Sequence, residues 1–183
     1  MNSALALLRR EHQRLLELAD ATDQLVGKIG AKQPVAPAGP GAVTELFSLF
    51  AHLIHRDKEE LLLFPLLRSK GFREGSCIGV LFSEHEECNV VYANMEQAAT
   101  DYAGGDTTAA ARWANAAHTY CDRLRYHVRR EELLFANAEQ MLSDSENAEL
   151  ISQFMRLDEK ARRAGLQERI EEAQQRLSEA LKT

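Results

Sequence analysis

The sequence predicts an all-α protein with four long helices and a helical C-terminal tail. Leucine, alanine, glutamate, glutamine and arginine dominate the chain of 183 residues, whereas valine, isoleucine and threonine are sparse. Nowhere do apolar and polar residues alternate as they do in a half-buried strand. Apolar residues instead recur at alternating steps of three and four, which places them along one face of a helix. We call each such row of residues a seam.

Two seams make up the first half of the chain. The first covers residues 5–26, and prolines and glycines within residues 34–41 then indicate a loop. Pro65 cannot donate a backbone hydrogen bond inside a helix, so we expect the second helix to kink or end near Leu61. The second seam contains, in chain order, Ser48, His52, His55, Glu59, Leu62 and Leu66.

The second half of the chain has the same organisation. Breaks are expected at residues 71–76 and at Gly104 and Gly105, and they bound a third seam over residues 78–99. A fourth seam covers residues 110–141. Every seam is interrupted by a histidine, and these residues are His12, His55, His85 and His127.

The C-terminal tail is expected to be helical as well. Ser143 and Glu146 form a capping-box pattern that marks a helix start, and Gly165 could end that helix. We expect residues 1–142 to form the bundle and residues 143–183 to form an extension that packs on it or on another copy, as a homodimer. A narrow apolar stripe suits this packing, and it consists of Leu166, Ile170, Ala173, Leu177 and Leu181.

Charge and hydropathy exclude several classes of protein. The formal charge of -6 comes with no basic block, so we expect no nucleic-acid partner. The longest apolar run, residues 61–67, is far shorter than the roughly 20 residues of a membrane span, so we expect no membrane partner. The apolar residues 4–8 lead directly into two arginines, unlike a secretory signal, and three cysteines without a CxxC pair do not suggest a disulfide framework. These features predict a cytoplasmic protein.

Two related stretches carry the chemistry, HRDKEELLLFP from His55 and HVRREELLF from His127. At about 100° and 1.5 Å per residue, His55 and Glu59 lie within roughly 40° of each other and one turn apart, and His127 and Glu131 share this spacing. A carboxylate is rarely buried alone, because an unpaired charge in a core costs several kcal/mol or takes up a proton. A metal ion would compensate both glutamates, and imidazole with carboxylate suits iron, manganese or zinc.

The duplication predicts a centre with two metal ions. Helix bundles build dinuclear sites from inward-facing histidines and carboxylates, and a carboxylate can bridge two ions. Each His–Glu pair would serve one half of the centre, with His12 and His85 added from the other two helices. Glu60 and Glu132 are rotated from the proposed ligands by about 100°, so we expect them to form surface ion pairs with arginine or lysine.

These stretches, together with REHQRLLEL around His12 and SEHEE around His85, resemble the hemerythrin-like family, also called HHE cation-binding domains. The resemblance covers residues 3–142. It implies an antiparallel up-and-down four-helix bundle with a non-haem di-iron centre, in which carboxylates and oxo or hydroxo groups bridge the irons and histidines are terminal ligands. Matched position by position, it implies that the metal ligands are His12, His55, Glu59, His85, His127 and Glu131.

One position departs from the family pattern. Oxygen-carrying members have HxxxH on the third helix, and the second histidine of that pair corresponds here to Asn89. The missing ligand argues against reversible oxygen carriage of the usual kind. His52 could replace it or could hydrogen-bond beside the centre. Tyr92 and Tyr120 could bind metal, could donate a hydrogen bond to a bound oxygen species, or could simply pack in the core. His118 is rotated roughly 180° from His127 and is expected to lie outside the site.

Three functions remain open from the sequence. A di-iron centre with an open position would bind or react with oxygen, nitric oxide or peroxide, for sensing, storage or scavenging. A related hypothesis is a di-iron redox enzyme, or an iron donor for iron-sulfur cluster repair. The third is a structural bundle that holds zinc or a single ion and docks an unidentified protein partner through its C-terminal stripe.

Overall fold

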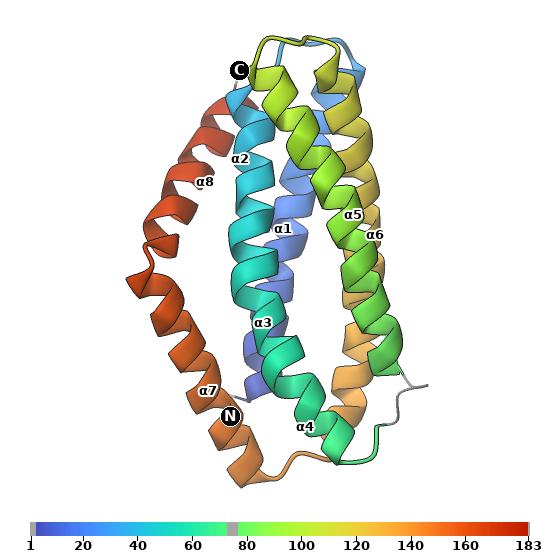
Figure 1. Cartoon of the computed structure of the whole chain (residues 1–183), viewed down its shortest axis with the longest axis vertical. Coiled ribbons are helices and arrows are strands. Elements are labelled where there is room, and N and C mark those ends of the chain that lie inside the picture. The colour runs from blue at the N-terminus through green and yellow to red at the C-terminus, as the bar shows by residue number, and fades with distance from the viewer. Residues whose placement is uncertain (1–2, 73–76, 183) are drawn as a thin grey trace.

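A computed structural model of the chain describes residues 3–72 and 77–182, and within these ranges it contains helices and no strand. Helices α1 (Ala4–Gly30), α5 (Cys77–Ala103), α6 (Ala109–Ala138) and a composite helix over residues 38–69 run alternately up and down as a bundle (Figure 1). The predicted all-α bundle is therefore confirmed. No helix in the described ranges is long and apolar enough to cross a membrane. Residues 73–76 of the expected break at 71–76 lie outside the described residues.

Helix α1 forms as its seam predicts. The Ser3 side chain accepts a hydrogen bond from the backbone N–H of Ala6, which satisfies one of the free donors at the helix start. The seam residues from Leu5 to Thr22 are buried, whereas at the C-terminal end Leu25 is buried instead of Val26.

The second long helix is a composite of α-helical and π-helical segments. In chain order these are α2 (Ala38–Leu46), η1 (Phe47–His55), α3 (Arg56–Lys58), η2 (Glu59–Leu63) and α4 (Phe64–Ser69). The predicted loop at residues 34–41 is wrong in its last part, because α2 begins at Ala38 and includes Pro40. Proline is tolerated there since N–H groups in the first turn have no partner inside the helix.

The π-helical turns change which residues of the composite helix face the core. The predicted seam is wrong at its ends, where Ser48, His52, Leu62 and Leu66 are only partly buried. In an α-helix, residues four apart differ in direction by about 40°, so a row of every fourth residue would wind around the helix. A π-helical turn holds more residues than an α-helical turn, so in this composite helix such a row stays on one face. The buried row of every fourth residue is Phe47, Ala51, His55, Glu59, Leu63 and Leu67.

Pro65 does not end the composite helix. The residue is exposed and lies in the first turn of α4, just after the π-helical segment η2 ends at Leu63, and the helix continues to Ser69. The chain bends in this region (Figure 1). Of the two outcomes expected for Pro65, the kink is confirmed, and the ending near Leu61 is wrong because the chain stays helical through Pro65 as far as Ser69.

Two apolar cores fill the bundle on either side of a polar layer. One core surrounds Trp113 and Phe47, and the other surrounds Phe64 and Phe135. On each of the four long helices, the seam histidine lies between residues of the first core and residues of the second core. The polar layer is thus enclosed by apolar side chains along the bundle axis.

Two further helices, α7 (Asp144–Arg163) and α8 (Leu166–Lys182), run along one side of the bundle (Figure 1). Ser143 and Glu146 form the predicted capping box, and Gly165 separates the helices at a φ of 75°, a value that favours glycine. In the apolar stripe of α8, Ile170, Ala173 and Leu177 are buried against the bundle of the same chain, and Leu166 and Leu181 at its ends are partly buried there. Helix α8 packs closely on α2, because a Cβ atom at Gly39 would lie 2.8 Å from the Cβ of Ala180.

Candidate metal centre

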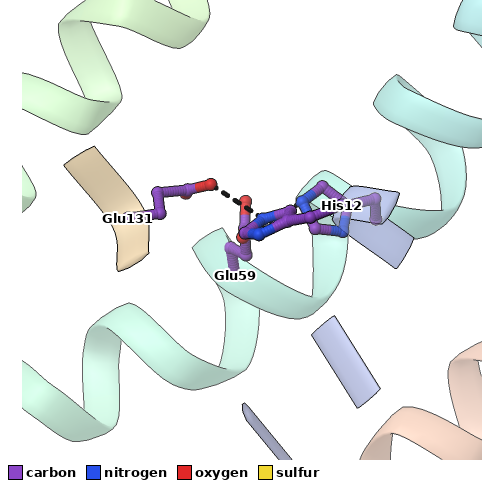
Figure 2. Close-up of side chains that lie close together, drawn as sticks. His12, Glu59 and Glu131 are labelled. Atoms are coloured by element: carbon purple, nitrogen blue, oxygen red, sulfur yellow. Dashed lines mark ion pairs between the residues drawn. The ribbon is translucent and has the colours of Figure 1, made fainter. Parts of the chain in front are cut away.

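The structure brings together all six residues that were expected to bind metal. Their side chains are buried in the polar layer and come from all four long helices of the bundle. Figure 2 shows His12, Glu59 and Glu131 pointing toward one another from three of these helices. The six residues are His12 on α1, His55 on η1, Glu59 on η2, His85 on α5, and His127 and Glu131 on α6.

The six side chains form two overlapping groups that could each hold a metal ion. Within each group, one ligand atom per residue lies within 4.8 Å of all the others. His12 and His55 belong to the first group, His85 and His127 belong to the second, and both glutamates belong to both. We refer to these as the His12–His55 half and the His85–His127 half. The shared glutamates are therefore placed as bridging ligands would be.

The two oxygens of each shared carboxylate face different halves. Oε1 of Glu59 lies 3.1 Å from His55 Nε2 and 3.6 Å from His12 Nε2, whereas Oε2 lies 3.6 Å from His85 Nε2. Oε2 of Glu131 lies 3.0 Å from His12 Nε2, and Oε1 lies 3.2 Å from His127 Nε2. All four histidines thus direct the same ring nitrogen, Nε2, at the carboxylates.

These short distances are not hydrogen bonds with good geometry. All four carboxylate oxygens of Glu59 and Glu131, and Nε2 of His12 and His127, are buried without a hydrogen-bond partner among the described residues. Buried polar atoms without partners are rare in proteins, and a cluster of them calls for a specific cause. The atoms converge on common points instead of on one another, so this donor set fits a cation between them.

Each site histidine also uses its other ring nitrogen, Nδ1, against an outer glutamate. The Nδ1–carboxylate distances are 3.4 Å for His12, 3.0 Å for His55, 2.6 Å for His85 and 2.9 Å for His127. Such a contact places the proton on Nδ1 and leaves the Nε2 lone pair free for a metal. In the same order of histidines, the outer glutamates are Glu132, Glu11, Glu60 and Glu84.

Each outer glutamate is paired in turn with a basic side chain. Glu60 and Glu132 form the ion pairs with arginine that were expected, but the surface role is incomplete because each also contacts a site histidine. Glu11 and Glu84 were not identified from the sequence, although each directly precedes a site histidine as Glu-His. The basic partners of Glu132, Glu11, Glu60 and Glu84 are Arg9, Lys58, Arg56 and Arg130.

In the metal-free site, the carboxylates favour the protonated, positively charged form of three site histidines. Burial opposes the imidazolium form, but Glu131, Glu132 and Glu59 outweigh it and raise the pKa of His12 to about 11. The pKa of His127 is likewise raised to about 10, and that of His55 to about 9, by the carboxylates beside them despite burial. Because metal-bound imidazole must be neutral, metal binding at this site would release protons.

A small cavity of about 30 Å³ lies beside the cluster and is lined in part by His55, His85 and His127. This volume exceeds the roughly 10–15 Å³ that one water molecule needs. His52 and Tyr120 line the same cavity, and His52 Nε2 lies 3.1 Å from the Tyr120 hydroxyl. Burial, with the nearby Arg56 charge, lowers the pKa of His52 to about 4, so its imidazole is neutral at physiological pH.

The remaining candidates lie outside both ligand groups. The ring of Tyr92 packs edge-on against His52, and its hydroxyl donates to Glu96 at 3.1 Å. Asn89, at the position of the missing histidine, accepts a hydrogen bond from Arg56 Nη1 at 2.9 Å. The side chain of His118 is 60% exposed and lies near Asp122, as expected for a residue outside the site.

A helix bundle with a buried cluster of histidines and shared glutamates defines a metal-binding class of helical protein. Residues 3–138 match the model of the hemerythrin HHE cation binding domain, and the chain therefore belongs to this family. The match ends before α7 and α8, which the family model does not cover. No curated protein and no solved structure matches the chain.

Proposed function

We propose that this protein holds two iron ions and binds or reacts with oxygen, nitric oxide or peroxide at an open iron position. The observation that carries the proposal is the orientation of Glu59 and Glu131, each of which directs one oxygen at either half of the cluster. A single ion would not need two carboxylates that each face both ways. The proposed ligands of the two ions are the six clustered residues.

The residues of this chain would have distinct roles. His12 and His55 would hold one ion, His85 and His127 would hold the other, and the outer glutamates would keep each Nε2 lone pair directed inward. Iron would supply the one-electron and oxygen chemistry, which no side chain of the site can perform. The apolar cores on both sides of the layer would limit the access of water.

The cavity beside the cluster supports a small ligand. Its volume of about 30 Å³ suits a molecule of a few atoms, and its wall includes three of the four site histidines. Besides the site histidines, the polar side chains on its wall that could orient such a molecule are Tyr120, His52 and Arg56. The remaining wall is largely apolar, which favours a neutral ligand such as a diatomic gas or hydrogen peroxide.

The first experiment is elemental analysis of protein purified without added metal, together with its variant His118→Ala as a control outside the site. We expect about two irons per chain in both proteins. Oxygen, nitric oxide and peroxide would then be added separately to the reduced protein, and ligand binding would be followed by visible absorption. One zinc per chain, or no metal after incubation with iron, would contradict the proposal and favour a structural bundle.

A peroxide-decomposing enzyme is a second candidate, and the His52–Tyr120 contact at the cavity favours it. These groups could hydrogen-bond to bound peroxide and assist the transfer of a proton to it. Turnover of peroxide by the iron-loaded protein, lost in Tyr120→Phe at unchanged iron content, would distinguish the enzyme from a binding protein. Stoichiometric binding without turnover would exclude it.

A further inference from the structure

The C-terminal helix α7 reaches one half of the candidate metal centre through a series of charged side chains. Asp158 on α7 places Oδ1 2.6 Å from Nζ of Lys58, which also contacts Oε1 of Glu11. The other oxygen of Glu11, Oε2, lies 3.0 Å from Nδ1 of His55. A continuous path therefore leads from Asp158 through Lys58 and Glu11 to His55.

Lys58 is buried to a degree that is unusual for lysine. Its exposed fraction is 1%, and Nζ lies 5.9 Å from the ring centre of Phe154, another residue of α7. A buried ammonium group needs anionic partners to offset the loss of hydration. Glu11 supplies one of them and Asp158 supplies the other, so α7 both covers Lys58 and helps to neutralise it.

The other three outer glutamates have no comparable link. Their basic partners Arg9, Arg56 and Arg130 belong to the bundle, and their side chains are 34%, 16% and 37% exposed. Within the described part of the chain, the ion pairs of these arginines join residues of the bundle and none involves α7 or α8. The link through Lys58 thus distinguishes the His12–His55 half from the His85–His127 half.

We propose that Lys58 and Asp158 are positioning residues, through which α7 sets the metal affinity of the His12–His55 half. This inference rests on the proposed function, since it requires that the cluster binds metal. With both residues present, Glu11 shares Lys58 with Asp158 and keeps Oε2 directed at His55. Without Asp158, Glu11 is the one remaining ion-pair partner of Lys58 among the described residues. The buried ammonium group then draws the Glu11 carboxylate toward Lys58, which weakens the contact with His55.

The test is a titration of metal-free protein with cobalt(II), followed by calorimetry and by visible absorption of the bound ion. In Asp158→Asn we expect one of the two binding steps to weaken about tenfold, the lower end of the range for outer partners of metal ligands. The other step should keep its affinity. Asp158→Glu retains the charge and should recover most of the lost affinity, which a purely structural defect would not predict.

A matched control is available where the other C-terminal helix, α8, forms ion pairs with the bundle. Glu45 on α2 accepts hydrogen bonds from Arg169 at 2.9 Å and from Arg176 at 2.5 Å, so it ties α8 to the bundle by two ion pairs. Among the described residues, Glu45 pairs with these two arginines and with no site histidine. Glu45→Gln should therefore leave both binding steps unchanged. Equal weakening in Glu45→Gln and Asp158→Asn, or no weakening in Asp158→Asn, would overturn the inference.

Failure of this inference can be distinguished from failure of the proposed function. If the unaltered chain binds neither cobalt nor iron, the proposed function fails, and the link is then tested in the metal-free protein by NMR. We expect the Nδ1 proton of His55 to shift or to exchange faster with water in Asp158→Asn but not in Glu45→Gln. An identical His55 resonance in both variants would overturn the inference without any metal present.

Discussion

The two halves of the candidate metal centre are alike in their inner groups. Each half has two histidines that direct Nε2 inward, and each histidine contacts an outer glutamate that is paired with a basic residue. The halves also share Glu59 and Glu131. The repeated stretch His-x-x-x-Glu-Glu-Leu-Leu thus supplies each half with equivalent chemistry.

The surroundings of the two halves differ. The His12–His55 half is linked to α7 through the buried Lys58, whereas Arg130 beside the His85–His127 half is partly exposed at the surface. Both histidines of the latter half line the small cavity, but only His55 of the former does. A duplicated motif therefore does not imply two equivalent metal ions, and we expect small ligands to approach the His85–His127 half.

The largest expected effect is on stability, and it depends on the two buried carboxylates that the halves share. Metal binding should raise the free energy of unfolding by about 2.7 kcal/mol for each ion at a free concentration of 100 times its Kd. Thermal unfolding with added iron and with a chelator measures this difference. Identical unfolding curves under the two conditions would mean that the cluster binds no metal in the folded state.

The next effect separates shared ligands from ligands of one half. Glu131→Gln should weaken the binding of both ions, because Glu131 directs an oxygen at each half. His85→Ala should weaken the binding of only one ion. Metal content per chain measures the outcome, with His118→Ala as the control. Loss of both ions from His85→Ala, with circular dichroism like that of the unaltered chain, would contradict the division into halves.

A third prediction concerns pH and the metal-free protein. The folded pKa values of His12, His127 and His55 are raised above 6.5, to about 11, 10 and 9. A raised pKa in the folded state stabilises the protein fully below pH 6.5, and this contribution is lost as the pH rises through the folded values. Urea unfolding at pH 6 and pH 10 should therefore show lower stability at pH 10.

The metal-loaded protein supplies the comparison for this pH effect. Metal ions replace protons on the histidines, so metal affinity should increase with pH over the range in which metal-free stability decreases. A variant such as His12→Gln, in the metal-free state, should lose part of the pH dependence. If its unfolding depends on pH as strongly as that of the unaltered chain, the charged cluster is not the cause.

The smallest effect is expected at the cavity, outside both ligand groups. Tyr120→Phe removes the contact with His52 at 3.1 Å and should lower the free energy of unfolding by about 1 kcal/mol. Because Tyr120 belongs to neither group, the metal content should not change. Urea unfolding and elemental analysis of the variant test both statements. Loss of one ion from the variant would instead mean that Tyr120 binds that ion or positions one of its ligands.

Much of the fold and of the cluster could be predicted from the sequence. The seams of α1, α5 and α6 follow the periodicity of an α-helix, so their buried residues were largely foreseen. The composite helix was the exception, because its π turns change the number of residues per turn, and neither π-helical segment contains a proline or glycine that would indicate this change. The predicted seam of this helix was correct only at His55 and Glu59, where η1 ends and η2 begins.

The outer glutamates show a different limit. Glu60 and Glu132 were predicted to pair with arginine, which they do, but their contacts with His85 and His12 depend on how neighbouring helices are placed. Position on one helix gives the direction of a side chain, whereas a partner on another helix depends on packing between helices. Sequence periodicity contains no direct information about that packing.

The sequence by itself determined the helical class, the membership of His12, His55, Glu59, His85, His127 and Glu131 in one cluster, and the absence of a histidine at Asn89. These follow from local periodicity and from the repeated motif. Only the tertiary structure decided which histidines form each half, how each shared carboxylate is oriented, and that Asp158 reaches Lys58. The reason is physical, because such contacts join residues far apart in the chain and depend on how whole helices pack together.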